Sequence, residues 1–340
     1  DAYALDFLAE LLSSGKKAPM YKVLEKEKEL TSRSYAYNNS QVLAGEFHVT
    51  VTANSGKSLN DIEKGMFEAF AMFEKDGATD RDIERIKAGL ETGFYNGISS
   101  VLGKSFQLAQ YNTFTGDPGF IEKDIENIKK VTKEDVMRVY NTYIKDKPYV
   151  ITSFVPKGQM DLIAENSTKA PVVEEEIKEN VAAVIEETKE EIVKTPSKID
   201  RSIEPEQGAS PSLNVPTSWT SDLANGMKVY GIEQNEIPTV NFSIRIDGGH
   251  LLDDMNKNGV ANLMTDIMME GTKNKTPEQL EEEIEMLGAS INMYTSDEAI
   301  TIRGNTLVRN FDKTIALVKE ILLEPRWDEE EFARIKTSTI

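Results

Sequence analysis

The sequence predicts an α+β protein built from repeated antiparallel-sheet subdomains, each with helices on one face of its sheet. Two observations support this class. Stretches in which apolar and polar residues alternate, as in paired strands, are separated by stretches with apolar residues at helical spacing. In addition, the order hairpin, helix and short charged motif occurs twice, with the motif reading DRDIERIK and then DEEEFARIK. A repeat of this size indicates related subdomains rather than a solenoid, whose units are shorter.

Residues 1–156 form the first predicted subdomain. Leucines at helical spacing predict a first helix that ends at Gly15, and a second short helix follows at about 19–28. The runs RSYAYNNS and EFHVTVTA, joined by VLAG, predict a β-hairpin. The remaining expected elements are a helix with Ser58 as N-cap, a long helical stretch over 79–114, a helix capped by Thr132 and a strand over 148–156.

Residues 157–215 form a predicted linker. Between Pro171 and Asp200 the sequence contains EEEIKENVAAVIEETKEEIVK, which is strongly acidic, and the proline-rich run PEQGASPSLNVP follows. This composition favours a solvated connector that contains one exposed or loosely docked acidic helix. A helix that binds a partner is the alternative.

Residues 216–340 form the second predicted subdomain. Two alternating runs around Asn225-Gly226 predict a hairpin, and the run TVNFSIRIDGG predicts a third strand. The run GVANLMTDIMMEGT then predicts an amphipathic helix. The later elements are a helix from Thr276 to Leu287, a hairpin at 291–305, a helix at 310–323 and a last helix from about Asp328.

Composition excludes several classes of function. The formal net charge is −19, which argues against nucleic acid or an anionic membrane as the main partner and favours neutral or cationic peptides. The charge also serves solubility. The absence of cysteine excludes a disulfide framework and thiol catalysis. No apolar run approaches the ~18 residues of a membrane span.

The amphipathic helix places Asn262, Thr265 and Asp266 on one side. From positions i, i+3 and i+4 a helix can offer two metal ligands and a general base, as in H-x-x-E-H metallopeptidases. Asparagine is a poor zinc ligand and threonine is no carboxylate base. We therefore expect no metal and no catalytic residue here, only a polar face that packs or meets solvent. A weak Ca²⁺ or Mg²⁺ site on Asp266 and Asn262 is the alternative.

Two glycines at the end of the third strand are the other candidate site. Gly248 and Gly249 lack a side chain that would keep a peptide backbone away, so a peptide could contact this sheet edge. A turn that needs positive φ is the alternative. His48 and His250 are isolated in the sequence, and one imidazole does not make a zinc site.

The amphipathic helix and the run that follows it, KTPEQLEEEIEMLGASINMYTSDEAITIRGNTL, resemble the pitrilysin/insulinase family of zinc peptidases, which includes the mitochondrial processing peptidases. Members of this inverzincin family carry G-x-A-H-x-x-E-H-x-x-x-x-G-T, a helix that ends in glycine and a hairpin. The two histidines and the glutamate fall on Asn262, Asp266 and Thr265, so the resemblance implies a degenerate motif. The family frame is kept at Gly259, Ala261, Gly271, Thr272, Leu287 and Gly288.

The first subdomain resembles the companion subdomain of the same family, in the run DGATDRDIERIKAGL and at Met20, Tyr21, Leu24 and Tyr35. The resemblance implies a zinc-peptidase-like metallohydrolase fold. It also implies that the chain is the centre of a protein with two related halves, of which the second is degenerate.

The same resemblance implies a function. This chain is expected to be a non-catalytic portion of a zinc-dependent metalloendopeptidase that forms chamber wall and peptide-contacting surface. The alternative is a non-catalytic assembly or peptide-binding subunit. No cofactor is expected in this chain, and zinc is expected only in an upstream subdomain with an intact H-x-x-E-H. The implied partners are the other subdomains of the parent chain and unfolded peptides, and resemblance to bacterial relatives favours the periplasm over the cytoplasm.

Overall fold

The structure of the protein, a computed structural model, describes residues 1–168, 171, 200, 202–204, 208, 212 and 215–339. Residues 1–167 and 235–340 form one compact unit and residues 168–234 form another. We call residues 1–167 the N-terminal module and residues 235–340 the C-terminal module of the larger unit. The acidic helix predicted between Pro171 and Asp200 lies outside the described residues.

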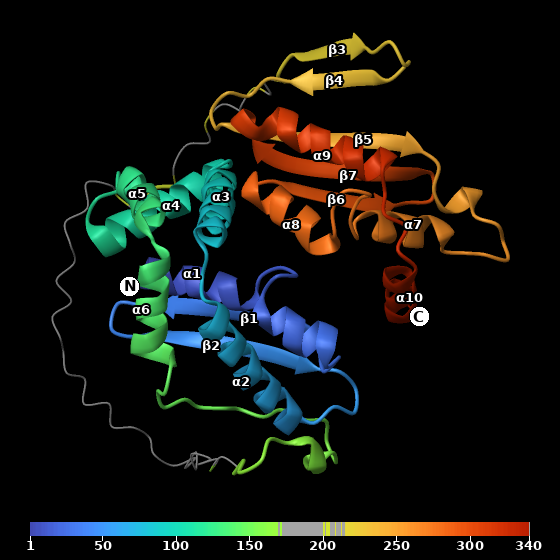
Figure 1. Cartoon of the computed structure of the whole chain (residues 1–340). Helices are drawn as coiled ribbons and strands as arrows, with labels where there is room; N and C mark the ends of the chain where they lie inside the picture. Colours follow the sequence, from blue (N-terminus) through green and yellow to red (C-terminus); the bar gives the residue numbers. More distant parts are fainter. Residues whose placement is uncertain are drawn as a thin grey trace. The chain divides into compact units, whose positions relative to one another are not determined.

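The N-terminal module is a two-stranded antiparallel sheet with helices packed on one face (Figure 1). The predicted hairpin is confirmed as β1 (Thr31–Ser40) and β2 (Gly45–Ala53). The helices are α1 (Ala2–Ser13), the π-helix η1 (Tyr21–Glu27), α2 (Leu59–Asp76), α3 (Asp80–Gly97), α4 (Val101–Thr115), α5 (Ile121–Lys130), α6 (Lys133–Val139), the π-helix η2 (Tyr140–Ile144) and the 3₁₀-helix η3 (Met160–Leu162).

Side-chain alternation along β2 explains which face of this sheet is covered. Phe47, Val49 and Val51 point to one side and pack against the core, whose fully buried residues include Phe7, Leu8, Leu12, Met20, Leu24, Val136 and Val139. The predicted caps are confirmed. Ser58 accepts a hydrogen bond from the N–H of Asn60 at 3.1 Å, and Thr132 forms a capping box with Asp135.

The helical stretch predicted over 79–114 is helical and consists of two helices, because the chain leaves the helix at residues 98–100 and Ser100 caps a new one. One prediction for this module was wrong. The segment 148–156 was predicted as a strand, yet it joins no sheet within the described residues. A run of strand-forming residues becomes a strand only when a partner strand lies beside it.

The C-terminal module has a three-stranded antiparallel sheet in the order β5-β7-β6, in which the predicted strand β5 pairs with the predicted hairpin β6–β7 (Figure 1). The core between sheet and helices includes Leu280, Ile284, Ile302, Val318 and Ile321. The elements are β5 (Thr239–Asp247), the 3₁₀-helix η4 (His250–Leu252), α7 (Val260–Met268), α8 (Pro277–Met286), β6 (Ser290–Thr295), β7 (Ala299–Leu307), the 3₁₀-helix η5 (Val308–Asn310), α9 (Phe311–Leu323) and α10 (Glu329–Thr339).

Helices α3 and α8 join the two modules of the larger unit. The guanidinium of Arg85, buried in α3, pairs with Glu285 of α8. Burial raises the pKa of Glu285, and the charge of Arg85 opposes that shift. Just beyond α8, Gly288 has a φ of +56°, and a Cβ there would lie 2.6 Å from the carbonyl oxygen of Ala88. A larger residue would therefore force α3 and α8 apart.

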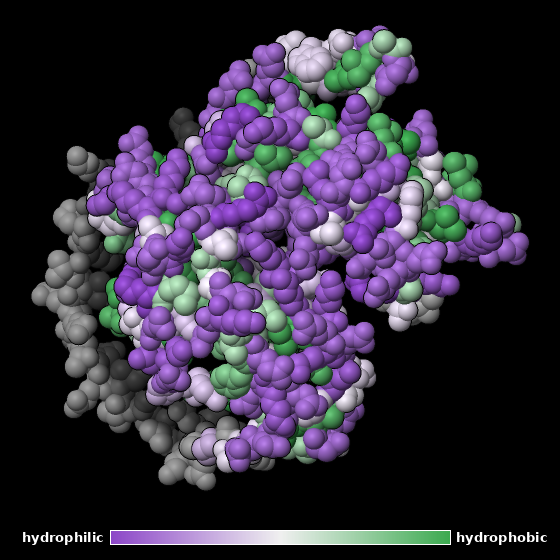
Figure 2. All heavy atoms as spheres, in the orientation of Figure 1, coloured by the Kyte–Doolittle hydropathy of each residue, from purple (hydrophilic) through white to green (hydrophobic). Residues whose placement is uncertain are grey.

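The smaller unit contains the hairpin predicted around Asn225-Gly226, with strands β3 (Ser218–Asp222) and β4 (Lys228–Ile232). Gly226 has a φ of +86°, which this tight turn requires. On the face of the molecule seen in Figure 2, hydrophilic residues predominate, in keeping with the high charge. None of the helices in the described residues is long and apolar enough to cross a membrane.

An ion pair beside the helix contact predicts a pH dependence. Arg309 of η5 donates two hydrogen bonds to Glu91 of α3, at 3.1 and 2.6 Å, and these bonds hold the pKa of Glu91 below its ordinary value. A depressed folded-state pKa means that the charged carboxylate stabilises the fold above about pH 4.3 and that this stabilisation is lost as the pH falls through the folded-state pKa.

Replacing Glu91→Gln should lower the free energy of unfolding by about 0.5–1 kcal/mol near pH 7, and by progressively less as the pH falls toward 3. Urea unfolding at a series of pH values measures this difference. Glu84→Gln on the same helix is the control, since Glu84 is exposed and its ion-pair partner among the described residues is Lys87, three positions along the helix. A difference between wild type and Glu91→Gln that stays constant down to pH 3 would contradict the assignment.

Candidate functional site

The candidate helix α7 begins at a well-formed cap. Asp253 accepts hydrogen bonds from the N–H groups of Gly259 at 3.0 Å and Ala261 at 3.1 Å. Burial alone would raise the pKa of Asp253, but these two bonds and the neighbouring His250 lower it. The Nδ1 of His250 lies 3.5 Å from the Asp253 carboxylate. His250 therefore serves the start of the helix and does not face the three candidate positions.

Thr265, which the sequence resemblance aligns with the family's glutamate, is inside the module and 1% exposed. Its hydroxyl donates to the carbonyl oxygen of Asn262 at 2.8 Å and lies 3.3 Å from the hydroxyl of Thr295 on β6. The Thr295 hydroxyl in turn donates to the carbonyl oxygen of Ala261 at 3.1 Å. The hydroxyl of Thr295 thus hydrogen-bonds β6 to α7, and the hydroxyl of Thr265 lies against it.

Asn262 and Asp266 lie on the exposed side of α7, one turn apart. Burial and the charge of Glu270 raise the pKa of Asp266. Glu270 is itself neutralised by Lys16 and by Arg334, whose Nη2 lies 3.1 Å from it. The structure therefore brings the three candidate residues together on one helix, but it gives Thr265 a different environment from the other two.

Gly248 and Gly249 form a tight corner with positive φ values of +146° and +119°. A Cβ on Gly249 would lie 2.3 Å from the carbonyl oxygen of Ser296, in the turn between β6 and β7. The N–H groups of Gly248 and His250 donate to carbonyl oxygens of that same turn, at 2.9 and 3.1 Å. The local geometry thus accounts for both glycines through the turn, and contact with a peptide stays a prediction.

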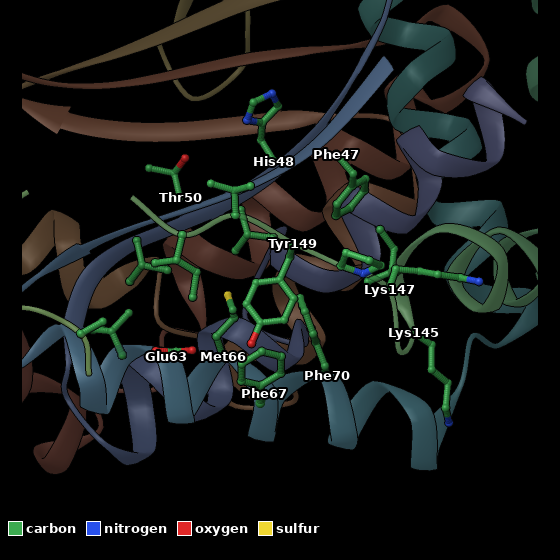
Figure 3. A pocket seen from close by; sticks show the side chains of 18 of the residues that line it. Phe47, His48, Thr50, Glu63, Met66, Phe67, Phe70, Lys145, Lys147 and Tyr149 are labelled. Carbon is green, nitrogen blue, oxygen red and sulfur yellow. The ribbon is translucent and has the colours of Figure 1, made fainter. Parts of the chain in front are cut away.

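Sequence reasoning missed an aromatic ladder on the open face of the β1–β2 hairpin, opposite the core. Tyr35 and Tyr37 stack with ring centroids 6.2 Å apart, Tyr37 stacks on His48 at 4.7 Å, and Arg33 lies 5.3 Å from the Tyr35 ring centroid. In Figure 3, His48 points away from Tyr149, Met66 and Phe67. The signal in the sequence was two tyrosines at spacing two in a strand whose partner strand places its apolar residues on the other face.

Comparison with known families identifies the protein class. Residues 228–340 match the model of the insulinase family, peptidase family M16, and residues 1–90 match the model of the peptidase M16 inactive domain. The chain belongs to the M16 peptidase family. The family and the α+β class predicted from the sequence are thereby confirmed.

Individual relatives cover only part of the chain. The chain is 29% identical over 122 residues to a probable mitochondrial-processing peptidase subunit beta of Arabidopsis thaliana. The matched region is 36% of this chain and 23% of that protein. The chain is 30% identical over 109 residues to cytochrome b-c1 complex subunit 1 of Bos taurus, or 32% of this chain and 22% of that protein. The chain thus spans less than a quarter of the length of these relatives.

Among solved structures, one match is the peptidase M16 inactive domain from Pseudomonas fluorescens. The sequence identity is 24%, and the match covers 36% of this chain and 30% of that one with a TM-score of 0.34.

The M16 family is zinc-dependent, and the donor set on α7 does not fit zinc. The hydroxyl of Thr265 already donates a hydrogen bond to the carbonyl oxygen of Asn262, and the side chain of Asn262 offers an amide, which is a poor zinc ligand. Asp266 is then the one strong donor of the three. Across the described residues, no three side chains of His, Cys, Asp or Glu gather closely enough to hold a metal ion.

The polar contact between α7 and β6 generates a stability prediction. Thr265→Val keeps the shape of the side chain and removes the hydroxyl, so the free energy of unfolding should fall by about 1 kcal/mol. Thr295→Val should lower the free energy of unfolding by about the same amount. The double variant should lower it by less than the sum of the two single variants, because the two hydroxyls are in contact with each other.

Chemical denaturation of the four proteins measures these differences. Asn262→Ala on the exposed side of α7 is the control and should change stability by less than about 0.5 kcal/mol. Strict additivity of the two threonine substitutions would show that their hydroxyls do not interact.

Proposed function

We propose that this chain is a non-catalytic portion of a larger zinc-dependent M16 metalloendopeptidase, in which it forms chamber wall and peptide-contacting surface. The observation that carries the proposal is the state of Thr265, which the resemblance aligns with the family's catalytic glutamate. Its side chain is buried, and its hydroxyl donates to the carbonyl oxygen of Asn262 and lies 3.3 Å from the hydroxyl of Thr295. A hydroxyl held in this way cannot take a proton from water at neutral pH.

The order of the matched regions supports a larger protein. A match to the inactive domain at residues 1–90 precedes a match to the insulinase domain at 228–340, so the chain crosses from one domain set into the next. In this proposal the parts 1–156, 157–215 and 216–340 are a companion subdomain, an acidic linker and a degenerate peptidase-like subdomain. Any catalytic zinc belongs to another part of the protein.

The aromatic ladder supports contact with peptides. Tyr35 and Tyr37 are 37% and 42% exposed, and together with His48 they offer a row of ring faces on an open sheet surface. Aromatic faces bind apolar and cationic side chains, and the net charge of −19 favours cationic peptides.

The second candidate is a non-catalytic assembly subunit of the same fold. It is favoured by the similarity to cytochrome b-c1 complex subunit 1, a protein named as a component of a complex. This candidate shares the degenerate helix but needs no peptide-binding surface.

Zinc analysis tests the non-catalytic helix. After dialysis, the wild-type chain should hold no stoichiometric zinc and show no chelator-sensitive peptide cleavage. The variant Asn262→His/Asp266→His places two imidazoles one turn apart on the exposed side of α7, so it should bind up to one zinc per chain and serves as positive control. Stoichiometric wild-type zinc, or cleavage abolished by Thr265→Ala, would overturn the proposal.

Peptide binding distinguishes the chamber wall from the assembly subunit. An unfolded, fluorescein-labelled 20-residue peptide of positive charge should bind the wild-type chain, and Tyr35→Ser/Tyr37→Ser should weaken binding at least fivefold. The matched control is Trp219→Ser/Tyr230→Ser, which removes two exposed aromatic residues from the β3–β4 hairpin. Fluorescence anisotropy measures both, and an absence of wild-type binding would favour the assembly subunit.

A further inference from the structure

A histidine on the open face of the β1–β2 hairpin contacts two different groups. Tyr37 of β1 lies opposite His48 of β2, and their rings are nearly parallel, at 10°, with centroids 4.7 Å apart. The Nε2 atom of His48 lies 2.8 Å from a carboxylate oxygen of Glu46, two residues earlier on the same strand. The imidazole therefore lies on an aromatic face and reaches a carboxylate at the same time.

A tyrosine ring beside a carboxylate is a binding site for a cation. An ammonium or guanidinium group over a ring face is attracted to it, and a carboxylate within hydrogen-bond distance strengthens the binding. The same hairpin already holds one such contact, because the guanidinium of Arg33 lies 5.3 Å from the ring centroid of Tyr35. Tyr37 and Glu46 offer the second such position, and the imidazole of His48 occupies it.

The protonation state of His48 determines how firmly the imidazole is held in this position. A neutral imidazole offers one hydrogen bond to Glu46, whose side chain is 71% exposed. An imidazolium adds an ion pair with Glu46 and a cation–π contact with the ring of Tyr37. Histidine is the side chain whose charge ordinarily changes between pH 5 and 8. Acidification within this range therefore fastens His48 to the cation site.

The strand register gives the other residues of this open face. With His48, they are Arg33, Tyr35, Tyr37 and Asn39 of β1 and Glu46, Thr50 and Thr52 of β2. Arg33 lies at the far end of the tyrosine row, since it pairs with Thr52 and not with the residues around His48. Asp6 of α1 bonds at 2.9 Å to Asn38, whose side chain belongs to the opposite face of β1. Glu46 is thus the carboxylate of the open face.

Other charged groups lie beyond the edge of β2, around a groove of about 900 Å³. Its lining includes Glu63 and Glu74 of α2 and the charged run Lys145, Asp146 and Lys147. Lys145 pairs with Glu74 at 2.7 Å. In Figure 3 the ring of His48 points away from the labelled side chains of Glu63, Lys145 and Lys147. The charge of the imidazole is therefore felt first at Glu46.

We propose that His48 is an internal, pH-dependent competitor for a cationic peptide. In acid its imidazolium occupies the cation site of Tyr37 and Glu46, and near neutral pH the uncharged ring yields that site to a basic side chain of the peptide. The inference rests on the proposed function, because the occupant is the peptide proposed to contact the aromatic ladder. Charge supports this occupant: with His48 neutral, the pair of His48 and Glu46 keeps one negative charge, on a chain whose net charge is −19.

Calorimetric titration at two pH values tests the competition. The probe is an unfolded 20-residue peptide, capped at both ends, whose only charged residues are arginines, so that it does not itself titrate. The intact wild-type chain should bind it about three- to tenfold more weakly at about pH 5.5 than at about pH 8. His48→Gln should bind equally at both. The chain has two histidines, so His250→Gln is the matched control and should keep the wild-type difference.

Proton release gives a second measurement. Because the peptide selects the neutral form of His48, binding at about pH 6.5 should release protons from the wild-type chain and not from His48→Gln, which titrations in two buffers of different ionisation enthalpy detect. Glu46→Gln should weaken binding at about pH 8, since it removes the carboxylate of the cation site.

The outcomes separate this inference from the proposed function. Equal wild-type affinity at the two pH values, tighter binding in acid, a difference that survives His48→Gln, or full affinity of Glu46→Gln would overturn the inference and leave peptide contact standing. An absence of wild-type binding at both pH values would overturn the inference together with the peptide-contacting role. None of these outcomes bears on the zinc analysis of α7.

Discussion

The close approach of α3 to α8 is the constraint on which the larger unit depends. Gly288 leaves no room for a side chain beside Ala88, and the buried Arg85 faces Glu285 one turn away. A buried ion pair contributes little net stability, because desolvation of both charges offsets their attraction, but a mismatched partner would be costly. The contact therefore determines which surfaces of the two modules pack together, and it adds little to the free energy of their packing. The ion pairs that surround it are more exposed, and salt weakens them: Lys17–Asp82, Lys17–Glu282, Arg81–Glu282 and Arg309–Glu91.

The two modules share one arrangement of hairpin and helix but differ in their surfaces. In each, a hairpin packs its apolar face against the helix that follows it. In the C-terminal module β5 pairs with the second strand of the hairpin, whereas in the N-terminal module the second strand borders a groove. The open face of the N-terminal hairpin carries stacked aromatic rings, and α7 of the C-terminal module carries Thr265 buried against β6. The same arrangement of elements thus carries different surfaces in the two modules.

Most of the elements could be predicted from the sequence, because their signals are local. Caps at Ser58 and Thr132, the turn at Gly226 and the helical spacing in α7 depend on residues only a few positions apart. The strand expected over 148–156 depends on a partner that the local sequence does not supply. The burial of Thr265 depends on Thr295, thirty residues away, and a polar residue on a polar helix face gives no sign of such a partner. The three motif positions could be named from their spacing, but their unequal environments could not.

The contact between Thr265 and Thr295 also bears on how this helix can change over evolutionary time. Asn262 and Asp266 are exposed, so substitutions there meet little resistance from the fold. Thr265 fits a closed space shared with β6, where a glutamate would be too long and would bury a charge. A glutamate at position 265 would therefore need a compensating change in β6 before it could be accommodated. A strand outside the helix thus limits which residues position 265 can carry.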